Sequence, residues 1–263
     1  MSAIAAIIAA IASIIGATLT FWAQNRVAKM QTQTQASIAQ MQAENQANLE
    51  QLKDGLQQRR EVRQKTEKAE EILAKYREPL VQAAFELQSR CYNILRGSVL
   101  KHFHANGNER EREYTVQNTC YVFAQYLAWT EIIRREVQFL NLGEIESNRR
   151  LNTLQENIRS VMLEASLGKI CRIFRGEQRA IGELMITTKG SDSFCIGYAE
   201  FVARKEPEFL NWFEPLRQSV NELARDLSCG TDRLTQLQHT LVDLIEYLDP
   251  DYMRFDKDRC QKA

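Results

Sequence analysis

The sequence predicts an all-α protein with an N-terminal membrane-spanning helix, a long helical stalk and a C-terminal multi-helix bundle. Three observations point to this class. Residues 3–22 carry no charge, the 263 residues include only 11 glycines and 4 prolines, and apolar residues recur at three- and four-residue spacing. Scarce helix breakers and this spacing favour long helices over a β fold. We expect an anchor at 1–23, a stalk at 24–77, a bundle at 78–255 and a tail at 256–263.

The first element is the uncharged segment 3–22, whose roughly 20 residues at about 1.5 Å each match the thickness of a bilayer core. Phe21 and Trp22 end it, and the cations Arg26 and Lys29 follow. These flanks favour a single pass with the N-terminus outside and the body in the cytoplasm. A cleaved signal peptide and a buried core helix are the alternatives. The segment lacks the basic start of a signal peptide, and it lacks the polar face expected of a buried core helix.

One face of this segment carries small residues at three- and four-residue spacing, among them Ala6, Ala10, Ser13 and Ala17. A stripe of small residues lets membrane helices approach closely and associate. Alanine used only as apolar filler is the alternative. We therefore expect membrane lipid around the segment and a homo-oligomer formed through the stripe.

The stalk, residues 24–77, contains no proline and is rich in Gln, Ala, Glu, Lys and Arg. Leu49, Leu52 and Leu56 follow the a and d spacing of a coiled coil, so they predict a second zone of self-association. The polar stretch 31–35 (QTQTQ) could instead be flexible.

Helical periods dominate the remaining chain, and no strand pattern competes with them. Residues 119–133 are apolar nearly all round, which predicts a central core helix. We expect Pro79 in a first helical turn, Thr231 as the cap of the last helix and a polar loop at 189–193. The expected helices cover about 80–95, 110–142, 144–167, 170–186, 195–204, 207–227 and 231–248.

Charge and cysteine usage restrict the chemistry. The 34 basic side chains equal the 34 acidic ones, so the balance gives no strong case for a nucleic-acid partner. The six cysteines lie far apart without a C-x-x-C pair, which indicates free thiols instead of zinc ligands or a disulfide framework. The sequence contains no P-loop and no nucleophile elbow. We expect no metal and no cofactor, and an enzyme is the less favoured class.

The densest polar feature lies at 174–183. Glu177 falls into an apolar stripe there, so its carboxylate must meet a cation, such as Arg134 or Arg135, or become neutral. Guanidinium groups suit phosphate or carboxylate, which predicts an anionic-ligand pocket. An ion-pair network between helices is the alternative. The predicted pocket residues are Arg175, Glu177, Arg179 and Glu183.

Arg96 and His102 form an R-x5-H spacing. This pair resembles the ribonuclease signature of HEPN domains, which are also helical bundles. The resemblance covers two residues, and Gly97 replaces the polar residue usual after the arginine. It implies that Arg96 and His102 from two subunits would meet at scissile RNA.

Two functions follow from these features. The preferred one is a membrane-tethered, oligomeric interaction or scaffold module whose body binds an unknown protein partner or a small anionic ligand. The alternative is a membrane-associated effector that either assembles a pore or cuts RNA as a HEPN-like ribonuclease.

Overall fold

The computed structural model describes the chain over residues 2–138, 146–190 and 192–263, apart from the side chains at 2–12, 15, 69, 72, 73, 137, 138 and 146–148. The helix α1 (Ser2–Leu95) runs through two compact units, residues 1–64 and 65–263. The described chain is predominantly helical, which confirms the all-α class in this general form.

The first unit consists of α1 alone, without a core of its own. Its large apolar side chains that the structure describes are open to solvent, and Leu49, Leu52 and Leu56 are 56%, 61% and 45% exposed. Ser13 and Ala17 are exposed too, while the side chains of Ala6 and Ala10 lie outside the described residues. The single helix predicted for the stalk is present, including the stretch 31–35.

Among the residues that the structure describes, no helical stretch combines the length and the apolar character that a membrane span requires. The side chains at 2–12 and 15, which make up much of the predicted anchor 3–22, lie outside those residues.

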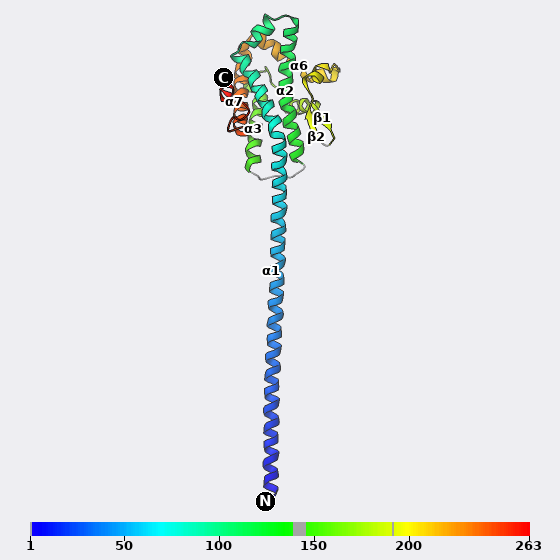
Figure 1. Ribbon diagram of the computed structural model, residues 1–263, viewed down its shortest axis with the longest axis vertical. Helices are drawn as coiled ribbons and strands as arrows, with labels where there is room; N and C mark the ends of the chain where they lie inside the picture. Colours follow the sequence, from blue (N-terminus) through cyan, green and yellow to red (C-terminus); the bar gives the residue numbers. More distant parts are fainter. Residues whose placement is uncertain (1, 139–145, 191) are drawn as a thin grey trace. The chain divides into compact units, whose positions relative to one another are not determined.

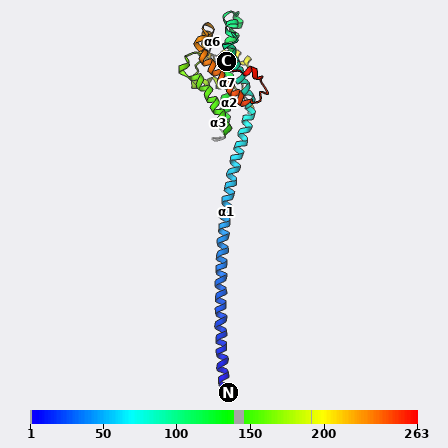
Figure 2. The same cartoon turned by 90° about the vertical axis from the view of Figure 1, so that its left-hand side faces the viewer.

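The second unit is a helical bundle joined to a small β-hairpin. In Figure 1, α3 lies beside α7 and the hairpin lies beside α2. Figure 2 shows the C-terminal segment, drawn red, alongside α7. Its other elements are η1 (Lys101–Ala105), α2 (Glu109–Gln138), α3 (Glu146–Leu163), η2 (Ala165–Leu167), α4 (Arg175–Leu184), β1 (Ile186–Lys189), β2 (Asp192–Cys195), α5 (Tyr198–Ala203), α6 (Pro207–Arg225), η3 (Leu227–Gly230), α7 (Thr231–Leu248) and η4 (Lys257–Cys260).

The core lies around α2, as the apolar stretch 119–133 predicts. Phe123, Tyr126 and Leu127 are buried there, and α2 packs against α4, α5, α6 and the hairpin. The C-terminal part of α1 contributes Leu87 and Cys91 to the same core. The central core helix predicted from 119–133 is therefore present as part of α2.

The hairpin corrects two expectations. The segment 170–186 is helical only over Arg175–Leu184. Within the loop predicted at 189–193, Lys189 ends β1, and Asp192 and Ser193 belong to β2; the two strands pair antiparallel from Ile186 with Cys195 to Lys189 with Asp192. Thr187 and Thr188 are β-branched, which favours an extended strand. The helix expected at 195–204 accordingly begins only at Tyr198.

Two helix ends also differ from expectation. Pro79 lies inside α1 and does not open a new helix. Gly230 occupies the N-cap position of α7, while Thr231 is its first residue and donates its hydroxyl proton to the carbonyl oxygen of Leu227 at 2.9 Å. The preceding turn η3 thus takes the place of a side-chain cap.

Candidate ligand-binding pocket

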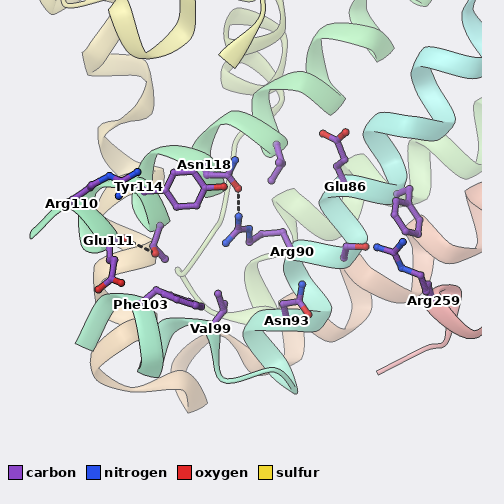
Figure 3. A pocket seen from close by; sticks show the side chains of 14 residues that line it. Glu86, Arg90, Asn93, Val99, Phe103, Arg110, Glu111, Tyr114, Asn118 and Arg259 are labelled. Carbon is purple, nitrogen blue, oxygen red and sulfur yellow. Dashed lines mark hydrogen bonds between the residues drawn. The ribbon is translucent and has the colours of Figure 1, made fainter. Parts of the chain in front are cut away.

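A cavity of about 630 Å³ opens in the second unit where α1, η1, α2 and η4 meet (Figure 3). This volume is typical of a small-molecule site. Its walls combine apolar and aromatic side chains with charged and amide groups. We call it the Arg90 pocket; it is lined by Phe85, Glu86, Ser89, Arg90, Asn93, Val99, Phe103, Arg110, Glu111, Tyr114, Thr115, Asn118, Val122 and Arg259.

Helical spacing places Arg90 in this pocket. Leu87, Cys91 and Ile94 of α1 are buried, and Arg90 lies at the border of that buried face. Its guanidinium points across the gap to α2 and donates a hydrogen bond to the amide oxygen of Asn118 (Figure 3). The bond joins residues 28 positions apart, so the fold assembles this pair.

The Arg90 guanidinium is partly desolvated. Burial lowers the pKa of Arg90, against weaker opposing effects of Tyr114, Cys91 and Tyr198. Among the described residues, no carboxylate lies within ion-pair distance of Arg90. A guanidinium has five N–H donors, and Asn118 accepts from one of them. The pocket thus contains a cation whose hydrogen-bonding capacity is largely unused by the protein.

The two carboxylates of the pocket wall are engaged elsewhere. Glu111 accepts a hydrogen bond from the backbone N–H of Asn108 at 2.8 Å, and Asn108 accepts one from the backbone N–H of Glu111 at 3.0 Å. This reciprocal capping box starts α2. Glu86 accepts a hydrogen bond from the side-chain amide of Gln82 at 2.6 Å. Neither carboxylate lies within ion-pair distance of Arg90 in the described structure.

Aromatic rings form the apolar part of the pocket. Phe103 and Tyr114 are 48% and 51% exposed, so much of their ring surface is free. Phe103 lies on the π-helical turn η1, a type of turn often found at functional sites. Gly107 allows this turn to pack tightly, because an added Cβ would lie 2.2 Å from the carbonyl oxygen of Phe103.

The structure places the residues predicted for an anionic site in separate contacts. Arg175 forms an ion pair with Glu156 of α3, and Glu183 accepts from Arg135 of α2 at 3.1 Å. Arg179 is exposed. Both ion pairs connect different helices, so they match the ion-pair alternative, and binding of a ligand by these residues stays a prediction.

Glu177 has a different partner from those expected. Its carboxylate accepts a hydrogen bond from the backbone N–H of Phe174 at 2.8 Å, at the start of α4. It therefore satisfies an N-terminal donor of the helix and is a capping residue. The arginines proposed to neutralise it, Arg134 and Arg135, instead bind Glu131.

Glu131 of α2 is 3% exposed and receives hydrogen bonds from Arg134 at 2.7 and 2.6 Å and from Arg135 at 2.9 Å. Burial alone would raise the pKa of Glu131, but the bonds from both arginines bring it below its ordinary value. The folded state therefore favours the ionised form. Its stabilising contribution is present above the unfolded pKa of about 4.3 and is lost as the pH falls through the lower folded pKa.

We expect Glu131→Gln to reduce the free energy of unfolding by about 1–3 kcal/mol at pH 7, because the amide cannot accept these charge-assisted bonds equally. The difference from the unmodified chain should shrink below about pH 4, where the carboxylate becomes protonated. Urea unfolding at pH 7 and at pH 3.5, about one unit below that unfolded value, measures both effects. An equal difference at the two pH values would contradict the assigned pKa shift.

Arg96 and His102, the residues that resemble a HEPN signature, are both exposed. Arg96 follows the end of α1, and His102 lies in η1. Among the described residues, no hydrogen bond or ion pair joins their side chains, and an arrangement between two subunits stays a prediction. No group of three or more His, Cys, Asp or Glu side chains that could hold a metal occurs in the described part of the chain.

Sequence reasoning missed the Arg90 pocket because its walls come from segments far apart. One signal was available: an arginine at the edge of the stripe formed by Leu87, Cys91 and Ile94 is a candidate for a desolvated cation. Comparison with known proteins gives no match, whether to a family model, a curated protein or a solved structure.

Proposed function

We propose that this chain is a membrane-tethered, self-associating helical interaction module whose body receives a small ligand or partner at the Arg90 pocket. The observation that carries the proposal is the exposure of Leu49, Leu52 and Leu56 along α1. Leucines at a and d spacing on an unpartnered helix favour burial against a second helix, and a second copy offers the same row. Isolated helices are marginal in water, so this pairing would stabilise the stalk.

The uncharged segment 3–22 supports the membrane tether. It is long enough for a bilayer, it ends at Trp22, and Arg26 and Lys29 follow it; these residues suit the interface on the side of the body. Anchoring also raises the local concentration of stalks, which helps a weak coiled coil to form. The proposed orientation has the N-terminus outside and the body in the cytoplasm.

The proposal predicts that Leu52→Asp lowers the mass of the assembly. A carboxylate at a d position would have to be buried at the helix interface, which is unfavourable. We expect full-length chain in membranes to resist carbonate washing, and the detergent-solubilised chain to form an oligomer in multi-angle light scattering. Leu52→Asp should shift this oligomer towards a monomer.

Gln51→Asp is the matched control, because Gln51 lies one position away and outside the a and d row. It should leave the mass unchanged. A monomeric unmodified chain would refute self-association, and extraction of the chain by carbonate would refute the tether.

A further inference from the structure

We infer that the Arg90 pocket binds a small aromatic acid, namely a flat ring bearing one carboxylate or phosphate group. The inference names the ligand class of the Arg90 pocket and so rests on the proposed ligand-binding function of that pocket. It does not depend on the proposed tether and assembly.

The anionic part of the ligand follows from Arg90. Its guanidinium faces the cavity with one acceptor, Asn118, on the protein side. A planar guanidinium presents paired N–H groups that match two oxygens of a carboxylate or phosphate. Such an anion would restore hydrogen bonds that the cation lost when it left water. Asn118 holds the group from the side of α2 and so helps to fix its orientation.

The charge of the pocket wall favours the same sign of ligand. Arg110 and Arg259 line the pocket together with Arg90, so three guanidinium groups face two carboxylates. Glu111 is held in the capping box of α2. The guanidinium carbon of Arg259 lies over the ring of Phe85, 5.0 Å from the ring centroid. An anion entering the pocket would therefore meet a net positive lining.

The ring of the ligand follows from Phe103, Tyr114 and Val99. The two aromatic side chains are about half exposed, and in Figure 3 both lie to the left of the Arg90 guanidinium. Tyr114 makes an edge contact with Tyr198, with 6.1 Å between the two ring centroids, and this contact supports the Tyr114 ring. An aromatic ligand would cover these exposed ring faces, and aromatic contacts add specific geometry to apolar burial.

The test is isothermal titration of the full-length chain in detergent with four probes. Benzoate and phenyl phosphate carry the predicted ring and anion, benzamide carries the ring without charge, and inorganic phosphate carries charge without a ring. We expect at least one of the two aromatic anions to bind at least tenfold more tightly than benzamide and inorganic phosphate. Whichever aromatic anion binds more tightly identifies a carboxylate or a phosphate as the preferred group.

Arg90→Gln should weaken binding of that aromatic anion about tenfold or more, as expected for loss of a charge-assisted hydrogen-bond pair. Arg225→Gln is the matched control, because Arg225 is an exposed arginine of α6 outside the pocket. It should leave the affinity unchanged. Phe103→Ala provides a second variant if Arg90→Gln does not fold, because Phe103 is outside the buried core. Phe103→Ala should weaken binding of the aromatic anion and leave the affinity for inorganic phosphate unchanged.

Failure of both aromatic anions to bind, or equal binding to the unmodified chain, Arg90→Gln and Phe103→Ala, would overturn the inference. Equal affinity for inorganic phosphate and phenyl phosphate, with no binding of benzoate, would also overturn it, because the ring would then contribute nothing. These outcomes are independent of carbonate washing and light scattering, so the pocket and the tethered assembly can fail separately.

Discussion

Arg233→Met is expected to reduce the free energy of unfolding by about 3–5 kcal/mol, because it removes a buried side chain that donates hydrogen bonds to four backbone carbonyl groups. Arg233 lies in the first turn of α7 and is 0% exposed. Its guanidinium donates to the carbonyl oxygens of Glu164 at 2.6 Å, Gly168 at 2.8 Å and Ile170 at 2.9 Å, and also to that of Val161.

These carbonyls belong to the end of α3 and the connection that follows it. The last carbonyl groups of a helix have no partner within the helix, and a cation there also interacts favourably with the helix dipole. Arg233 therefore fastens the connection between α3 and α4 to the start of α7. Methionine fills similar space but cannot donate these hydrogen bonds, so each of the carbonyl oxygens loses its guanidinium donor.

Urea unfolding followed by the near-ultraviolet signal of the body measures this loss. Arg225→Met is the control: it makes the same substitution at an exposed position of α6 and should change stability by less than about 0.5 kcal/mol. Equal stabilities of the two variants would show that the carbonyl contacts of Arg233 contribute little.

Arg233 also illustrates what sequence patterns leave out. The leucine row of α7 is visible in the sequence, and Leu234, Leu237, Leu241 and Leu244 are all buried as that row predicts. Arg233 precedes the row and resembles a surface residue, because its partners are backbone carbonyl groups. Every residue has such a group, so no side-chain pattern indicates which ones a guanidinium will reach.

The hairpin was missed for a different reason. Strands β1 and β2 contain four residues each, which is too short for an alternating pattern to stand out. Met185 lies four positions after Ile181, so the helical spacing extends past the true end of α4 at Leu184. Tertiary packing of β2 against α2 decides between the two conformations.

Candidate sites are harder to predict than helices. A helix requires only local spacing of residues, whereas a site requires residues that the folded chain brings together. The polar segment 174–183 attracted attention through its charge density, yet Glu177 caps a helix and Arg175 pairs with Glu156. Arg90 has no unusual neighbours in the sequence. Its role as a pocket cation depends on Asn118 of α2 and on the turn η1, which only the folded chain brings together.

Gly182→Ala should destabilise the body by about 1–3 kcal/mol, the usual cost of overpacking a tightly packed core. Gly182 is a buried residue of α4 at its contact with α2. An added Cβ would lie 2.7 Å from the carbonyl oxygen and 3.1 Å from the carbonyl carbon of Leu127. Backbone atoms within a helix cannot move aside as a flexible side chain can, so the two helices must separate.

Gly176→Ala in the same helix is the matched control. A Cβ at Gly176 would meet nothing within 4 Å. Alanine there should stabilise the helix by up to about 1 kcal/mol, because glycine has the lower helix propensity. Thermal unfolding of the two variants should thus shift in opposite directions. A parallel shift would mean that helix propensity, and not the contact with Leu127, determines the effect at Gly182.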